Sequence, residues 1–476
     1  MESSLTTSPN KASLLVLLLL LCLSFFSISN AEISGKLGVN YGQLGNNLPS
    51  PSHSIKLIES LKLGRVKLYD ANPEILKPLS KTHLQVSIMV PNQLIPNISF
   101  SQSASDKWVR SNLLPFYNKT RIRNLLVGNE ILTDYSNKQL WYDLVPAMRR
   151  IKQSLNTHNI KNVKVGTTLA MDALQTTDPP SNATFRPDIS DSVMKPLLKF
   201  VSETRSYYFV NVYTYFAWAA DPNKTKLDYA LLRRTGQTYT DPGSGLTYTN
   251  LLDQLLDSVY SAMGSIGYSD IRITIAETGW PSNGDFDQIG ANIYNAAIYN
   301  RNLARKMATK PPLGTPARPG WVIPTFIFAL YNENEKGGPG TERNWGLLYP
   351  NGSRVYEADL TGKKSDSSYG PLPNPTNNVP YRGRIWCVAG AGKANATALG
   401  MAVSYACGEG NGTCEAIHRG RECYLPNDLV SHASYAFNSY WQQFRRVGGI
   451  CFFNGLAVQT TKDPSYGSCK FPSQYN

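Results

Sequence analysis

Eight short runs of apolar residues recur between residues 37 and 333, and polar or turn-forming segments separate them. Within each run the apolar residues are nearly continuous rather than alternating with polar ones, which is typical of parallel strands buried on both faces. We therefore predict eight buried strands. The runs are LGVNYG (37–42), RVKLYD (65–70), QVSIMVP (85–91), RNLLVGNE (123–130), VKVGTTLA (163–170), YYFVNVYTYF (207–216), IRITIAETGW (271–280) and TFIFALYNE (325–333).

Helical patterns lie between these runs. In residues 140–155, an apolar stripe is formed by Leu140, Leu144, Met148, Ile151 and Leu155. Similar stripes occupy residues 251–263 and 289–307, and they are most simply explained as helix faces packed on a core. Strands that alternate with helices over about 300 residues predict an α/β fold, the (β/α)8 TIM barrel, with a doubly wound open sheet as the alternative.

The cysteines divide the chain into two parts. None occurs between residues 32 and 386, whereas six fall between residues 387 and 469. An even set of closely spaced cysteines in a secreted chain is typical of disulfides, and the lack of a CxxC pair disfavours the rival zinc site. We therefore expect a small cysteine-rich module at residues 384–476, and the spacing leaves its pairing open. The six are Cys387, Cys407, Cys414, Cys423, Cys451 and Cys469.

Residues 362–383 are rich in Pro, Ser and Asn and poor in apolar residues, which is typical of a linker. We expect this segment to offer few contacts between the two units. The predicted organisation is therefore a signal peptide at 1–31, a barrel at 32–361, a linker at 362–383 and the cysteine-rich module at 384–476.

The N-terminus predicts the compartment. An apolar run at residues 13–28 follows Lys11 and precedes small residues near Ala31, which is typical of a cleaved secretory signal. The run is short for the alternative, a transmembrane anchor, and the polar C-terminus lacks the apolar tail of a lipid-anchor signal. We expect a secreted protein without a membrane anchor. Its Asn-x-Ser/Thr sequons fit that route: Asn97, Asn118, Asn182, Asn223, Asn351, Asn395 and Asn411.

Composition narrows the class of protein. Apolar residues make up 42% and charged residues 17%, whereas disordered chains are poor in apolar and rich in charged residues. The net charge of +13 favours polyanionic partners, but the basic residues are scattered, so we expect no nucleic-acid binding. The chain has no P-loop, G-x-G-x-x-G, H-E-x-x-H or G-x-S-x-G motif, so we predict no metal or nucleotide cofactor.

Carboxylates follow several of the predicted strands. Glu130, Glu277 and Glu333 each end an apolar run, and in a barrel the carboxyl ends of the strands form the active site. The alternative for any one of them is a salt-bridged strand end without chemistry. Two facing carboxyls suit glycoside hydrolysis, with a separation of about 5 to 5.5 Å for retention and about 6.5 to 9.5 Å for inversion. Aromatic residues near strand ends could stack on sugar rings, although any one of them alone is more often a packing residue. They are Tyr41, Tyr213, Tyr215, Phe216 and Trp280.

Four motifs carry a resemblance to a known family. GVNYG, LLVGNEIL, IAETGWPSNG and FALYNENEKGGPGTERNWGLLYP resemble, in order over roughly residues 36–358, the plant β-1,3-glucanases of glycoside hydrolase family 17. At the C-terminus, WCVA followed by five more cysteines resembles the X8 module, carbohydrate-binding family 43, which binds β-1,3-glucan.

The resemblance implies roles for individual residues. Glu130 is the implied acid/base and Glu277 the implied nucleophile, while Asn129 matches an asparagine that contacts the sugar 2-hydroxyl. Glu333, Lys336 and Glu342 match a supporting ionic cluster, in which a lysine helps to keep one carboxylate ionised. Thr278 and Glu335 depart mildly from the family pattern. The implied disulfides are Cys387–Cys451, Cys407–Cys414 and Cys423–Cys469.

The implied activity is that of a retaining endo-β-1,3-glucanase acting on callose- or laminarin-type glucans. We keep two alternatives: a glucan transglycosylase, and an inactive glucan-binding wall protein, although both glutamates are present. We expect a monomeric glycoprotein whose partner is β-1,3-glucan. Its expected location is the cell wall or apoplast, with the vacuole as the alternative.

Overall fold

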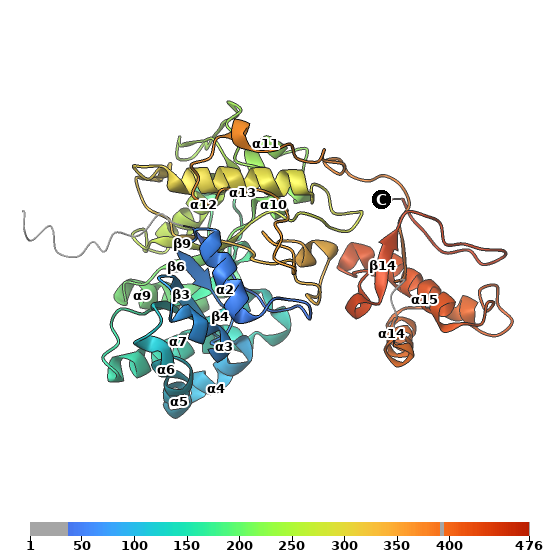
Figure 1. The fold of residues 1–476 in the computed structure, drawn as a ribbon, viewed down its shortest axis with the longest axis horizontal. Helices are drawn as coiled ribbons and strands as arrows, with labels where there is room; N and C mark the ends of the chain where they lie inside the picture. The colour runs from blue at the N-terminus through green and yellow to red at the C-terminus, as the bar shows by residue number, and fades with distance from the viewer. Residues whose placement is uncertain (1–36, 391–394, 476) are drawn as a thin grey trace, which may run out of the picture.

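The computed structural model describes residues 37–390 and 395–475. Its larger part is a closed barrel of eight parallel strands, as the apolar runs predict (Figure 1). The closure excludes the open sheet that was the alternative. In spatial order the strands are β1 (Gly38–Asn40), β12 (Thr325–Ile327), β9 (Ile273–Thr278), β6 (Tyr208–Asn211), β5 (Lys164–Ala170), β4 (Ile122–Asn129), β3 (Gln85–Val90) and β2 (Arg65–Lys67).

The strands are shorter than most of the runs that predict them, and the largest differences are at β6 and β12. β6 ends at Asn211, and helix α10 (Thr214–Ala220) takes up the rest of its run. After β12 the backbone also pairs with residues 345–348, while Phe328 N and Leu330 N still donate to the neighbouring barrel strands. Ala329 N donates to Trp345 O at 2.9 Å, and Leu348 N donates to Leu330 O at 2.9 Å. Glu333 therefore lies in a loop rather than at a strand end.

Helices cover the outside of the barrel. The stripe predicted at residues 140–155 is the buried face of α7, and the next two stripes lie on α12 and α13. Asn250 and Asn292 begin α12 and α13, because each side chain accepts a hydrogen bond from a backbone N–H of the first turn. The covering helices are α2 (Pro51–Ser60), α3 (Pro73–Leu79), α4 (Ile95–Phe100), α5 (Gln102–Asn112), α7 (Gln139–Thr157), α9 (Lys195–Glu203), α12 (Leu251–Ser265) and α13 (Ile293–Ala308).

The cysteine-rich module is a separate unit with its own apolar core. Strands β13 (Trp386–Ala389) and β14 (Ala457–Thr460) form an antiparallel pair, which packs with helices α14 (Ala396–Glu409) and α15 (Leu429–Phe444). The pairing implied by the family resemblance is confirmed. The disulfides are Cys387–Cys451, Cys407–Cys414 and Cys423–Cys469.

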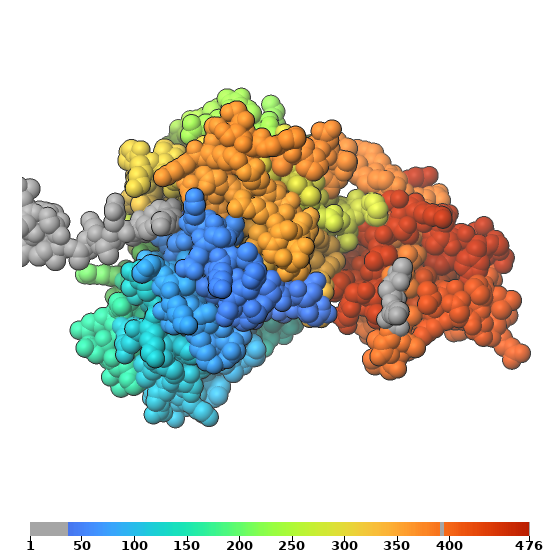
Figure 2. Space-filling view, viewed as in Figure 1, coloured from blue at the N-terminus to red at the C-terminus, as the bar shows by residue number. Residues whose placement is uncertain are grey.

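The segment between the two units differs from the expected free linker. Asn377 and Asn378 accept hydrogen bonds from the Asn292 side chain at 2.7 and 2.9 Å, and Asn295 donates to Asn378 at 2.7 Å. Linker composition is polar because it must face water, but asparagine amides also serve as fixed hydrogen-bonding groups. The segment is therefore held against the start of α13. Figure 2 shows the module packed beside the barrel.

The predicted signal peptide lies outside the described residues. Within residues 37–390 and 395–475, no helix has the length and apolar character needed to cross a membrane.

Candidate active site

A cavity of about 510 Å³ opens at the carboxyl ends of the barrel strands. It brings Glu130, which follows β4, together with Glu277 of β9, as the strand-end argument predicts. Two loops complete the wall, one after β5 with Asp172 and one after β12 with Lys336 and Glu342. The other lining residues are Ala170, Met171, Thr177, Asn211, Tyr213, Phe216, Ala217, Leu255, Phe328 and Trp345.

Glu277 is a buried carboxylate that accepts three hydrogen bonds. Lys67 Nζ lies 2.6 Å and the Tyr69 hydroxyl 2.7 Å from Oε1, while the Tyr213 hydroxyl donates to Oε2 at 2.8 Å. Burial by itself raises the pKa of the carboxyl, but the Lys67 charge and the three donors outweigh it and bring the pKa below its usual value. Glu277 is therefore held in the ionised form.

The donors to Glu277 are themselves held in place. Lys67 is fully buried on β2, so its ammonium contacts the carboxylate instead of water. Burial lowers the pKa of Lys67, and the negative charge of Glu277 opposes that change. Asn40 of β1 donates to the Tyr69 hydroxyl at 3.1 Å and to Ala276 O at 3.0 Å. These contacts fix the orientation of the carboxylate from three different strands, β1, β2 and β9.

Glu130 has the opposite electrostatic character. Burial and the negative charge of Glu277 raise its pKa to about 7, although the Asn211 amide, 2.9 Å from Oε1, partly opposes this. A carboxyl with this pKa is largely protonated at mildly acidic pH. The two carboxyls of the cavity therefore differ in protonation, which is the arrangement that an acid and a nucleophile require.

The backbone at Glu130 is strained. Its φ of 50° lies in the left-handed region, which side chains other than glycine rarely adopt, and Gly128 has a φ of 74°. The Glu130 N–H is held by Thr168 O on β5 at 2.9 Å. This bend turns the chain at the end of β4 and places the Glu130 side chain in the cavity.

Asn129 supports this bend through hydrogen bonds with Asn92 and Thr168. Its Oδ1 accepts a hydrogen bond from Thr168 Oγ1 at 2.5 Å, and its backbone N–H and C=O both bond to the Asn92 side chain. Asn129 is absent from the residues that line the cavity, whereas Asn211 lines it and contacts Glu130 directly.

The predicted ionic cluster is only partly assembled. Lys336 Nζ pairs with Glu342 at 2.8 Å, and both line the cavity. Glu333 is buried, and its Oε1 accepts a hydrogen bond from Leu44 N at 2.7 Å. The cation hydrogen-bonded to Glu277 is Lys67 rather than the lysine of this cluster.

The candidate stacking residues separate into two groups. Tyr213 and Phe216 line the cavity with Phe328 and Trp345. Tyr41, Tyr215 and Trp280, in contrast, are buried outside it. Trp280 Nε1 donates to Gly290 O at 2.8 Å, and Tyr41 packs edge-on against Tyr331. Direct sugar contact by Tyr41 or Trp280 is therefore not supported, and both are packing residues near the site.

The sequence patterns did not single out Lys67, Tyr69 or Asn211. A signal for the first two was present: Lys67 and Tyr69 are two residues apart at the end of the run RVKLYD, so they point to the same face of a strand. A lysine and a tyrosine on the inner face of a barrel strand need a buried partner. Residues 37–390 and 395–475 contain no group of three or more His, Cys, Asp or Glu side chains placed to hold a metal ion.

Comparisons with known proteins cover both units. Residues 37–360 match the model of glycosyl hydrolases family 17, and residues 385–458 match that of the X8 domain. An Arabidopsis thaliana protein named "Probable glucan endo-1,3-beta-glucosidase A6" is 55% identical over 442 residues, 93% of this chain and 92% of that protein. A "Glucan endo-1,3-beta-D-glucosidase" of Olea europaea is 36% identical, and the match covers 98% of both chains.

Solved structures match the larger unit. The structure of a β-1,3-glucanase and allergen of Cryptomeria japonica pollen is 39% identical, with a TM-score of 0.65, and the match covers 68% of this chain and 99% of that one. A plant β-glucan endohydrolase structure is 34% identical with a TM-score of 0.62, covering 68% of this chain and 100% of that one.

Proposed function

Because the chain belongs to glycosyl hydrolases family 17 and is a glycoside hydrolase, we propose that it is a retaining endo-β-1,3-glucanase acting on callose- or laminarin-type glucans. One observation carries the proposal. Glu277, held ionised by Lys67, Tyr69 and Tyr213, shares a cavity with Glu130, whose pKa is raised to about 7.

In the first step, Glu130 protonates the glycosidic oxygen while Glu277 attacks the anomeric carbon. Lys67 and Tyr69 both bind Oε1 of Glu277, which leaves Oε2 as the attacking oxygen. Tyr213, which binds Oε2, releases it as the new bond forms. The leaving oxygen departs as a hydroxyl and Glu130 becomes ionised.

In the second step, Glu130 acts as a base and removes a proton from water, which attacks the anomeric carbon and frees Glu277. Loss of the negative charge on Glu277 in the covalent intermediate removes one cause of the raised Glu130 pKa. The pKa of Glu130 therefore falls at the stage of the reaction where Glu130 must be ionised to act as a base.

The substrate class rests on the relatives and on the cavity wall. The two relatives described above are named as glucan endo-1,3-β-glucosidases. Phe216, which is exposed on the cavity wall, offers a ring that suits the flat face of a glucose unit. An endo mode means that the cleft binds internal segments of the polymer, with units on both sides of the cleaved bond.

Product profiling on a linear β-1,3-glucan tests this function. We expect early release of a range of oligosaccharides and a rapid fall in mean chain length. Release of glucose alone would contradict the endo mode, and products longer than the starting oligosaccharides would support the transglycosylase instead. Glucan binding without any product would support the inactive wall protein.

The proposal includes a role for the cysteine-rich module and a location. We assign residues 32–361 to the barrel, 362–383 to the connecting segment and 384–476 to the module, which binds β-1,3-glucan. The three disulfides and the sequons support secretion to the cell wall. Recovery of a glycosylated protein from the wall fraction of expressing plant tissue tests the location, whereas recovery from the vacuole would contradict it.

A further inference from the structure

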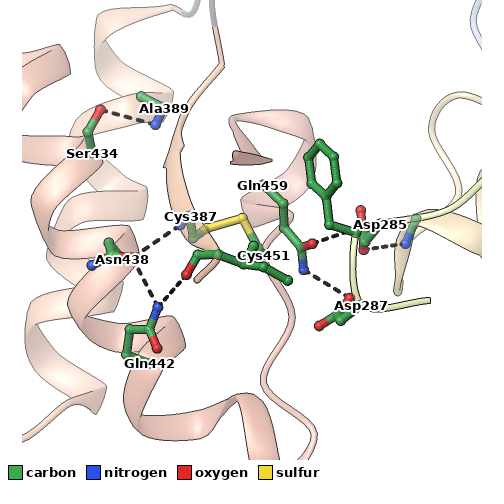
Figure 3. Close-up of a disulfide and its surroundings, with 12 residues drawn as sticks. Asp285, Asp287, Cys387, Ala389, Ser434, Asn438, Gln442, Cys451 and Gln459 are labelled. Carbon is green, nitrogen blue, oxygen red and sulfur yellow. Dashed lines mark hydrogen bonds between the residues drawn. A yellow bond between two sulfur atoms is a disulfide. The ribbon is translucent and has the colours of Figure 1, made fainter. Parts of the chain in front are cut away.

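The cysteine-rich module contacts the loop that follows β9. Gln459 of β14 uses both ends of its amide: Oε1 accepts a hydrogen bond from Phe286 N at 2.9 Å, and Nε2 donates to Asp287 Oδ1 at 3.2 Å (Figure 3). Gln459 pairs across the strands with Cys387, which is bonded to Cys451. The contact therefore starts from a rigid part of the module.

A second contact reaches the loop that follows β12. The Arg343 guanidinium lies 3.9 Å from the ring centroid of Phe452, the residue after Cys451. Arg343 also donates hydrogen bonds to Lys336 O at 3.2 Å and Gly338 O at 3.0 Å. Phe452 is 9% exposed, yet it is not among the described residues that form the module's own apolar core. Its burial thus depends in part on the barrel.

The connecting segment restricts how far the module can move. Asn377 and Asn378 are hydrogen-bonded to the start of α13, and Gly290 N also donates to Asn377 O at 2.7 Å. Only six residues, 379–384, separate Asn378 from the buried Ile385 of the module. Even fully extended, this stretch spans at most about 25 Å. The effective tether is therefore short.

The two contacted loops are tied to each other and to the cavity. Asp285 Oδ2 accepts a hydrogen bond from Gly340 N at 2.7 Å, and Gln288 bonds to both the backbone and side chain of Thr341. Lys336 and Glu342, on the second loop, line the active-site cavity. A continuous set of contacts thus joins Phe452 and Gln459 of the module to this wall of the cavity.

We propose that the cysteine-rich module is docked on the loops after β9 and β12 and braces the cavity wall that carries Lys336 and Glu342. The module then acts as a positioning element for the barrel as well as a separate glucan-binding unit. It follows that cleavage of short soluble oligosaccharides depends on the interface, even though such substrates do not need the module for binding. This kinetic consequence rests on the proposed glucanase function, whereas the docking itself does not.

Two variants of the full chain test whether the docked module stabilises this wall of the cavity. Phe452→Ala removes the ring under Arg343, and Gln459→Ala removes the amide contacts without touching the module's core. Met401→Ala, which shortens an exposed side chain on α14, is the matched control. Hydrogen exchange is measured for residues 336–343 and, as a check that the module stays folded, for α15. The KM for a soluble β-1,3-linked oligosaccharide is measured in parallel.

We expect both interface variants to speed exchange of residues 336–343 about fivefold or more, in line with the loss of one partly buried contact. The KM should rise about three- to tenfold with kcat changed less, because the wall positions substrate. Exchange or KM equal to that of Met401→Ala in both variants would overturn the proposal. If the wild type cleaves no β-1,3-glucan, the proposed function fails, and the exchange data still decide the docking.

Discussion

Lys67 Nζ lies 2.6 Å from Glu277 Oε1, and both groups are buried inside the barrel. The two residues come from β2 and β9, which are separated in the barrel by β1 and β12. Neither charge is tolerable at such a depth without the other, because desolvation penalises each alone. The pair therefore explains how one carboxylate of the cavity stays ionised beside a second carboxyl that stays protonated.

Lys67→Met is expected to lower kcat/KM by about 100-fold or more. Without the ammonium, burial dominates and the pKa of Glu277 rises, so the acidic limb of the pH profile moves to higher pH. The pH dependence of kcat/KM measures this shift. Lys56→Met makes the same change at an exposed position on α2 and should leave the profile unaltered. An unchanged acidic limb in Lys67→Met would show that Lys67 does not set the charge of Glu277.

The wild-type pH profile should be bell-shaped. Activity needs protonated Glu130, so it should fall as pH rises through about 7, and it needs ionised Glu277, so it should fall below the usual carboxyl pKa. Asn211 donates a hydrogen bond that favours ionised Glu130. Asn211→Ala should therefore shift the alkaline limb upward, even as the maximum falls. A downward shift of that limb would contradict the assignment of Glu130 as the acid.

Glu130→Gln is expected to change stability in a pH-dependent way. The pKa of Glu130 is raised from 4.5 to about 7 on folding, so its favourable contribution is complete below about pH 4.5 and is lost as pH rises through 7. Above that pH the ionised carboxyl costs at most about 3 kcal/mol, a cost that glutamine avoids. In thermal unfolding, the stability of the variant relative to the wild type should rise between pH 5 and pH 8.

The control for this stability series is Glu59→Gln, at an exposed position on α2. The stability of this control should change with pH in the same way as that of the wild type. A constant difference between Glu130→Gln and wild type across the range would mean that the Glu130 pKa is not raised in the folded protein. The same variant should cleave substrates with activated leaving groups better than natural glucans, because such groups need little protonation.

Reduction of the disulfides should disrupt the module and leave the barrel folded. The Cys387–Cys451 bond closes 64 residues, and in the chain-entropy account it stabilises the module by about 4 kcal/mol. After treatment with a thiol reductant, we expect insoluble β-1,3-glucan no longer to remove the protein from solution. The thermal unfolding transition of the barrel should persist. Retained binding after complete reduction, checked by thiol counting, would show that the module needs no disulfide to bind.

The sequence predicted the barrel and both carboxyls because strand order and strand ends are local features of the chain. Glu130 and Glu277 could be identified from the runs that precede them. Lys67 could not be paired with Glu277, because the contact joins strands that are three apart around the barrel and 210 residues apart in sequence. That proximity exists only once the barrel has closed.

Two features of the molecule depend on tertiary packing that the sequence does not encode. Trp280 and Tyr41 lie near strand ends, but an aromatic ring there points either into the cavity or outward into the helical layer, and composition does not distinguish the two. The polar composition of the connecting segment predicted a linker that offers few contacts between the two units. Whether Asn377 meets water or the start of α13 depends on tertiary packing, which composition does not encode.

The anomeric configuration of the first product decides whether Glu277 attacks the sugar while Glu130 supplies the proton. Cleavage of a β-1,3-linked oligosaccharide is followed by proton NMR from the first seconds, before mutarotation mixes the anomers. We predict that the newly formed reducing end appears first as the β anomer. First appearance of the α anomer would mean that water attacks directly, and it would contradict the role of Glu277 as nucleophile.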